Sequence, residues 1–277
     1  MGRVDIIATD LDGTLLTDDK RISDINKKAM FDAAQRGIYI VPATGRALHT
    51  MPQNVLELDC VKYAVTSNGA AIVDVKSGET LYKNQMSINT ALHVINQSLE
   101  LGIMVEIFTD GRAYTLKRYI DDLVGFGVNS RFVKWYLDTR NVVDNFSNLL
   151  INDATVENIN LIFNDLDKRV EMRKWLAAYP EVELTNSLGN NIEVGVKNCG
   201  KGAALTVLAE MLGSDMSRVM CLGDNENDID MLKRAGISIG MSSGQDSVKE
   251  NVTYVAKGNN DDGFAEAVYK FAIDKML

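Results

Sequence analysis

Two carboxylates stand one residue apart near the start of the chain, in the run Asp10-Leu11-Asp12-Gly13-Thr14. An apolar stretch of strand length, residues 4–9, precedes them. Alternate residues of an extended segment face the same way, so both side chains are expected to enter one small volume. Like charges that close repel each other unless a cation lies between them or one carboxylate holds a proton. Either outcome makes Asp10 and Asp12 candidates for metal binding or acid–base chemistry.

A second acidic loop, Gly223-Asp224-Asn225-Glu226-Asn227-Asp228, follows another apolar run of strand length, Val219-Met220-Cys221-Leu222. In open parallel α/β sheets, ligands bind beyond the carboxyl ends of the strands. Two acidic loops at the ends of buried-strand patterns therefore indicate one ligand site assembled from distant parts of the sequence. The first loop taken alone is better interpreted as an acidic turn that acts only as a cap, and the second loop is what favours the ligand site.

Composition favours a globular enzyme with a sizeable core. The chain has 277 residues, of which 46% are apolar and 24% charged, and this length suits roughly two domains. No apolar run approaches the roughly 20 residues needed to cross a bilayer, so no membrane partner is expected. The net charge of −9 argues against a nucleic-acid partner, which would need a basic surface.

The cysteines and the chain start predict a cytoplasmic location. Cys60, Cys199 and Cys221 form no CxxC pair, and we expect them to be reduced and mostly buried. The few residues ahead of the first strand leave no room for a signal peptide.

Helix and strand signals alternate in the first 84 residues, as in a doubly wound α/β sheet. Ser23 is positioned to cap a helix that Gly37 ends. Beyond the first strand the expected elements are a helix over 24–36, strands over 39–43 and 63–67, and a hairpin of 71–75 and 80–83.

The pattern changes near residue 85 to hairpins mixed with helices, which indicates an inserted α+β unit. Its expected elements are helices over 87–101 and 167–178, and strands over 104–109, 112–117, 158–163, 182–185 and 191–194. The alternation of helices and strands seen in the first 84 residues then returns, with helices over 200–212, 228–234 and 263–275 and strands over 219–222 and 237–239. The predicted domains are a core of residues 1–84 and 191–277 and an insertion of residues 85–190.

Five motifs in this order make the resemblance specific. The sequence resembles the haloacid dehalogenase superfamily, and within it the Cof-type sugar-phosphatase branch, whose α/β cap is inserted after the third strand. The motifs are Asp10-Leu11-Asp12-Gly13-Thr14-Leu15, Thr44-Gly45-Arg46, Ser67-Asn68-Gly69, Lys201-Gly202 and Gly223-Asp224-Asn225-Glu226-Asn227-Asp228. The last motif departs from the family pattern, because Asn225 and Glu226 replace the usual glycines and add a charge that could affect metal affinity.

This resemblance implies a Mg²⁺-dependent phosphatase that acts on a small phosphorylated metabolite, with sugar phosphates as the expected class. Asp10 would be the nucleophile that forms an aspartyl phosphate, and Asp12 the general acid and base. The implied metal ligands are the Asp10 carboxylate, the Asp12 backbone carbonyl and Asp224, supported by Asp228. The implied phosphate-binding residues are Thr44, Gly45, Lys201 and Asn227, with secondary roles for Arg46 and Asn68.

Two alternatives use similar residues. A phosphomutase would share the core but return the phosphoryl group to a second hydroxyl of a sugar. A receiver-like regulatory module would also phosphorylate an aspartate, but it would lack the inserted cap and the acid at position 12. For the oligomeric state, we expect a monomer or a homodimer.

Overall fold

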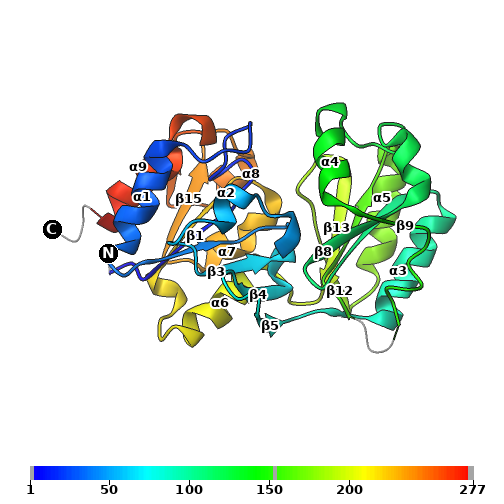
Figure 1. Cartoon of the computed structure of the whole chain (residues 1–277), viewed down its shortest axis with the longest axis horizontal. Coiled ribbons are helices and arrows are strands. Elements are labelled where there is room, and N and C mark those ends of the chain that lie inside the picture. Colours follow the sequence, from blue (N-terminus) through cyan, green and yellow to red (C-terminus); the bar gives the residue numbers. More distant parts are fainter. Residues whose placement is uncertain (1–2, 152–154, 274–277) are drawn as a thin grey trace. The chain divides into compact units, whose positions relative to one another are not determined.

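The computed structural model describes residues 3–151 and 155–273. The chain divides into two compact units, shown in Figure 1. The core unit comprises Met1–Gly45, Met51–Lys83 and Gly200–Leu277, and the inserted unit comprises Arg46–Thr50 and Asn84–Cys199. The insertion therefore extends past the predicted boundary at residue 191, and the strand over 191–194, which we expected among its elements, pairs within the inserted sheet. It also includes a short segment that directly follows Gly45.

The core unit contains a five-stranded parallel sheet in the order β16-β15-β14-β1-β2. Strands β1 and β14 are buried along their whole length, as expected when helices cover both faces of a parallel sheet. This arrangement confirms the predicted α/β class. The strands are β1 Ile6–Thr9, β2 Tyr39–Pro42, β14 Val219–Gly223, β15 Ile237–Met241 and β16 Tyr254–Ala256.

Helices pack on the core sheet from both sides (Figure 1). Leu205 and Leu208 of α6 pack in one cluster with Ile6 and Cys221 from one face of the sheet. Helices α1 and α9 pack together, and the amide of Ala265 donates to Asn26 Oδ1 at 3.0 Å. The helices are α1 Asp24–Ala34, α2 Gln53–Leu56, α6 Lys201–Met211, α7 Ile229–Arg234, α8 Asp246–Lys249 and α9 Gly263–Val268, the last continued by a π-helical turn over Tyr269–Ile273.

The third predicted strand leaves the main sheet. Strand β3, Tyr63–Thr66, pairs antiparallel with β4, Ala71–Asp74, which pairs with β5, Thr80–Lys83. Isolated parallel bridges, Ile40↔Val61 and Ala43↔Val65, join β2 to the segment around β3. The end of β3 therefore stays beside the end of β2 even though a continuous ladder is absent between them in the described residues.

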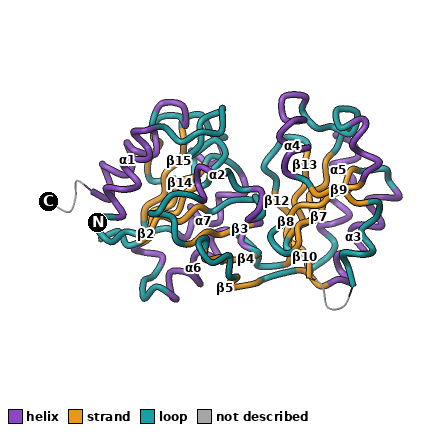
Figure 2. Tube along the Cα trace, viewed as in Figure 1, coloured by secondary structure: helices purple, strands orange, loops and turns teal. Residues whose placement is uncertain are grey.

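The inserted unit is built on a six-stranded, mainly antiparallel sheet in the order β12-β13-β11-β7-β8-β9. Helices α3 and α5 contribute to the apolar cluster that also holds Ile107, Ile159 and Val194 of this sheet. Figure 2 shows its strands and helices by type. The elements are β6 Met86–Ser87, α3 Ile88–Glu100, β7 Met104–Thr109, β8 Arg112–Leu116, α4 Val133–Thr139, β9 Asn141–Val143, β10 Thr155–Val156, β11 Asn158–Ile162, α5 Leu166–Ala177, β12 Val182–Thr185 and β13 Asn191–Val196.

The face of the inserted sheet that points away from this apolar cluster carries polar residues. Glu106 pairs in register with Thr115 on one side and with Asn160 on the other, and Asn160 pairs with Glu193. Arg140 donates from Nε to Glu106 Oε1 at 2.6 Å, and Asn160 Nδ2 donates to Glu106 Oε2 at 2.7 Å. This buried charge is therefore paired and hydrogen-bonded, as a buried carboxylate requires.

The expected final helix over 263–275 extends in part beyond the described residues. Within these, Asp165 begins α5 as a helix cap, accepting from the amide of Asp167 at 2.9 Å. No helix in the two described stretches is long and apolar enough to span a membrane.

Candidate active site

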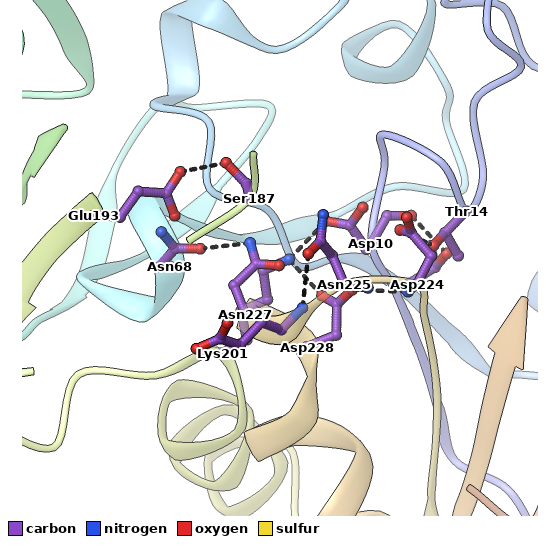
Figure 3. A network of polar contacts seen from close by, with 12 residues as sticks. Asp10, Thr14, Asn68, Ser187, Glu193, Lys201, Asp224, Asn225, Asn227 and Asp228 are labelled. Atoms are coloured by element: carbon purple, nitrogen blue, oxygen red, sulfur yellow. Dashed lines mark hydrogen bonds and ion pairs between the residues drawn. The ribbon is translucent and has the colours of Figure 1, made fainter. Parts of the chain in front are cut away.

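Three carboxylates and one ammonium from distant segments meet at the carboxyl ends of β1 and β14 (Figure 3). Asp10 directly follows β1, and Asp224 and Asp228 follow β14. Each of these aspartates offers one oxygen, and the three oxygens lie within 4.8 Å of one another. The two acidic loops thus form a single group, as their positions after two buried-strand patterns led us to expect.

Lys201 lies between two of these aspartates. Its Nζ is 2.6 Å from Asp10 Oδ1 and 2.6 Å from Asp228 Oδ1. The lysine and Asp228 side chains are fully buried, and the Asp10 side chain is 9% exposed. A buried ammonium of this kind is stable only when anions surround it. Lys201 therefore fixes the relative positions of Asp10 and Asp228.

Electrostatics in this cluster leave negative charge uncompensated. Burial is the main cause that raises the pKa of Asp10, and Asp228, Asp224 and Asp12 add to the increase, while Lys201 opposes it. Burial, followed by the charge of Asp228, raises the pKa of Asp224 to about 7. Burial alone would lower the pKa of Lys201, but Asp10 and Asp228 outweigh it and raise that pKa. A cation placed among these oxygens would relieve the repulsion.

Asp228 is held by hydrogen bonds that leave it little freedom. Its Oδ2 accepts from the amides of Asp224 at 2.9 Å and Asn225 at 3.0 Å, while its Oδ1 accepts from Lys201. The side chain of Asn225 accepts from the amide of Glu226 at 2.8 Å and forms a capping box with Asp228. The asparagine that departs from the family pattern thus has a local role as a helix cap.

Asp224 is supported from two further segments. The hydroxyl of Thr14 donates to Asp224 Oδ1 at 2.9 Å. Gly13 has a positive φ of 88°, and a Cβ there would lie 2.5 Å from Asp224 Oδ2. The amide of Gln245, in the loop after β15, donates to the Asp224 carbonyl at 2.9 Å. Glycine at position 13 is therefore required both by the backbone conformation and by the carboxylate beside it.

Lys201 is placed by the packing of α6 against two neighbours. A Cβ on Gly69 would lie 2.2 Å from the Gly200 carbonyl oxygen, so the turn that contains Gly69 packs directly on the start of α6. Cβ atoms on Gly200 and Gly202 would lie 2.6 and 2.7 Å from Asp230 Oδ2. That oxygen accepts from the amide of Ala203 at 3.1 Å and so caps a helix whose own N-cap residue has no side chain.

Asn68 links two of the other predicted residues. Its Oδ1 accepts from Asn227 Nδ2 at 3.1 Å, and a Cβ on Gly45 would lie 3.1 Å from the same oxygen. The amide of Asn68 donates to the Thr44 carbonyl at 3.0 Å. The left-handed backbone of Asn68, with a φ of 55°, makes this approach possible. Thr44, Gly45, Asn68 and Asn227 therefore form a second connected group.

Two predicted residues have different surroundings. The Asp12 carboxylate lies outside the three-aspartate group and accepts from Lys20 Nζ at 2.6 Å. Arg46 belongs to the inserted unit, where its Nη1 donates to the Thr50 carbonyl at 2.9 Å and its guanidinium lies 4.7 Å from the centroid of the Trp135 ring. Sequence reasoning did not anticipate Lys20 or Asp230, because neither falls in a recognisable motif.

Comparison with known proteins decides the family. Residues 7–268 match the haloacid dehalogenase-like hydrolase family, which covers nearly the whole chain. The chain belongs to this family. The predicted resemblance is thereby confirmed, and the protein is a Cof-type phosphatase, a hydrolase of phosphoric monoesters.

Relatives of this hydrolase agree in length as well as in sequence. It is 33% identical over 266 residues to a Bacillus subtilis protein named 5-amino-6-(5-phospho-D-ribitylamino)uracil phosphatase YcsE, covering 96% of this chain and 94% of that one. Among solved structures, a haloacid dehalogenase-like hydrolase from B. subtilis matches with a TM-score of 0.86 at 24% identity, covering 97% of this chain and all of the other. TM0651 from Thermotoga maritima matches with a TM-score of 0.78 at 25% identity, covering 97% and 98%.

Proposed function

We propose that this hydrolase is a Mg²⁺-dependent phosphatase that acts through an aspartyl phosphate on Asp10. The observation that carries the proposal is the buried contact of Lys201 with both Asp10 and Asp228, beside Asp224. Carboxylate oxygens are hard ligands, which suit Mg²⁺. Burial and the charges of neighbouring carboxylates raise the pKa values of Asp10 and Asp224, so a cation among their oxygens would be favourable. This donor set therefore fits the metal.

Asp10 and Asp224 would hold the metal through their side chains, and Asp12 through its backbone carbonyl. When bound, the cation supplies the positive charge that allows an anionic nucleophile to approach a phosphate dianion. Asp228, whose oxygens are occupied by Lys201 and two amides, would instead hold the loop that carries Asp224. Thr44, Gly45 and Asn227 would donate to the phosphate oxygens, as their link through Asn68 allows.

The residues then divide the reaction into two steps. Asp10 attacks phosphorus, the bond from phosphorus to the leaving oxygen breaks, and Asp12 gives its proton to that oxygen. Water next attacks the phosphoryl group while Asp12 takes a proton from it, and the bond between Asp10 and phosphorus breaks to release inorganic phosphate. Lys201 keeps the Asp10 carboxylate oriented throughout, because its ammonium also holds the immobile Asp228.

We further propose a phosphorylated sugar or sugar alcohol as the substrate class. The relative at 33% identity is named for a substrate with a phosphorylated ribityl chain, and it aligns with this hydrolase over 96% of the chain. A small metabolite of this kind would need no nucleic-acid or membrane contact, and the net charge of −9 does not favour an anionic polymer.

Phosphate release from a panel of phosphorylated sugars, sugar alcohols and nucleotides, with and without Mg²⁺, tests this function. The expected result is Mg²⁺-dependent release of inorganic phosphate, with an acyl phosphate that hydroxylamine traps. Asp10→Asn should abolish turnover and trapping while leaving the circular dichroism spectrum unchanged. Retained turnover in Asp10→Asn would exclude Asp10 as the nucleophile, and transfer to a second sugar hydroxyl without phosphate release would indicate a mutase.

A further inference from the structure

Lys20 contacts the carboxylate that the reaction uses as acid and base. Its Nζ donates to Asp12 Oδ1 at 2.6 Å, and the Lys20 and Asp12 side chains are 35% and 36% exposed. An ion pair this open to solvent contributes little to folding stability. The contact nevertheless places a positive charge directly on a group expected to exchange a proton with the leaving oxygen.

The backbone at Lys20 adopts a conformation that lysine does not favour. Its φ is 60°, in the left-handed region where glycine is the least costly residue. The turn is closed by a hydrogen bond from the Lys20 amide to the Thr17 carbonyl at 2.8 Å and by another from the Thr17 amide to the Arg21 carbonyl at 2.8 Å. A lysine therefore stands where glycine would be more stable, which directs attention to its side chain.

Three asparagines from other segments hold this turn in place. Asn54 Nδ2 donates to the Lys20 carbonyl at 3.2 Å. Asn259 Nδ2 donates to the Leu16 carbonyl at 3.0 Å, and Asn260 Oδ1 accepts from the amide of Asp18 at 3.1 Å. The polar segment before α9, which has no catalytic motif of its own, thus anchors the loop that presents Lys20.

We propose that Lys20 is a positioning residue for Asp12 in the phosphatase reaction, an inference that rests on the proposed function. Its ammonium holds Asp12 Oδ1, which can accept this hydrogen bond whether or not the carboxyl group carries a proton. The other oxygen, Oδ2, is then the atom that gives the proton to the leaving oxygen as the bond from phosphorus breaks. In the second step Oδ2 takes a proton from the attacking water.

Leaving-group dependence separates this role from a structural one. An alkyl phosphate releases a strongly basic alkoxide and needs an oriented acid, whereas p-nitrophenyl phosphate releases a stable phenolate and needs little help. A defect in the placement of Asp12 should therefore reduce kcat/KM, which reports the step that releases the leaving oxygen, far more for the first substrate than for the second. General distortion of the site would reduce both together.

Lys20→Gly tests the proposal because glycine suits the positive φ and removes only the side chain. We expect kcat/KM for a sugar or alkyl phosphate to fall by about 10- to 100-fold, and that for p-nitrophenyl phosphate by less than about threefold. The melting temperature should not fall. Arg21→Met is the matched control, since Arg21 is the next residue and its side chain, 75% exposed, pairs with the equally exposed Asp19 at 3.0 Å.

Lys20→Arg, which keeps a cation, should recover part of the lost alkyl phosphate rate. Equal losses on both substrates in Lys20→Gly, or no loss on either, would overturn the positioning role. Failure of the proposed function has a different signature, because the unsubstituted enzyme would then release no phosphate from either substrate, or Asp10→Asn would remain active.

Discussion

Replacing Lys201 by methionine removes the positive charge from the centre of the candidate site. The ammonium lies 2.6 Å from carboxylate oxygens of both Asp10 and Asp228, and the lysine side chain is fully buried. Methionine fills much of the same volume, so the change acts chiefly on charge. Removal of one partner from a buried ion pair leaves uncompensated charge and costs about 3–5 kcal/mol. We expect a loss of this size from the free energy of unfolding of the core unit.

The loss should depend on pH. Burial, reinforced by neighbouring carboxylates, already raises the pKa of Asp10, and loss of Lys201 raises it further. A carboxyl group with a raised folded-state pKa favours folding at low pH, and this contribution disappears as pH rises through that pKa. The difference between Lys201→Met and the unsubstituted protein should therefore be largest near pH 8 and smaller near pH 5.

Urea unfolding in the presence of a chelator measures this effect. Circular dichroism reports both units, whereas tryptophan fluorescence reports the inserted unit, where both Trp135 and Trp175 lie. Lys201→Met should lower the urea midpoint of the core-unit transition detected by circular dichroism. The midpoint of the fluorescence transition should stay unchanged. The double variant Lys201→Met/Asp228→Asn should regain stability without regaining activity. A loss below about 1 kcal/mol near pH 8 would show that Lys201 does not compensate the buried carboxylates.

Three further outcomes can be measured. Gly13→Ala should reduce kcat and Mg²⁺ affinity by about 10-fold or more, because the new Cβ would lie 2.5 Å from Asp224 Oδ2 and the backbone φ at this position is 88°. Phosphate release and calorimetry measure the two effects. Arg140→Met should destabilise the inserted unit by about 3–5 kcal/mol in fluorescence-detected unfolding, because Glu106, with a fully buried side chain, loses its cation; Arg140→Met/Glu106→Gln should recover most of this loss. The pKa of Asp224 is raised from 3.8 to about 7, so the free energy of unfolding of the metal-free protein should fall by up to about 4 kcal/mol as pH rises from about 4 to 8. Mg²⁺ should restore this stability. An unfolding free energy that does not change with pH in chelator would contradict the assignment.

The sequence predicted the groups of the site better than the contacts that hold them. Asp10 and Asp224 each follow an apolar run of strand length, so their approach at the carboxyl edge of one sheet could be expected from the sequence. Lys201 could be assigned from its motif, but its bridging contact with Asp228 depends on how α6 packs against the turn at Gly69. That packing involves residues more than a hundred positions apart, which periodicity does not relate.

Lys20 and β16 show where local pattern carries too little information. Lys20 lies in a polar run that resembles an ordinary exposed turn, and its backbone conformation depends on Asn54 and the segment near Asn259. Strand β16, Tyr254–Ala256, has three residues, too few to display an alternation. The departure of β3 from the main sheet had the same cause, since a short apolar segment does not specify which neighbour it pairs with.

The order of strands in the core sheet has a consequence for biosynthesis. Strand β1 pairs with β14, more than 200 residues later, so this pair of strands cannot form until β14 has left the ribosome. The intervening unit forms its own six-stranded sheet from β7, β8, β9, β11, β12 and β13, and it can fold before β14 is available to pair with β1. Nascent chains that end before residue 219 therefore expose an unpaired edge of β1 and are the species that most need protection by chaperones.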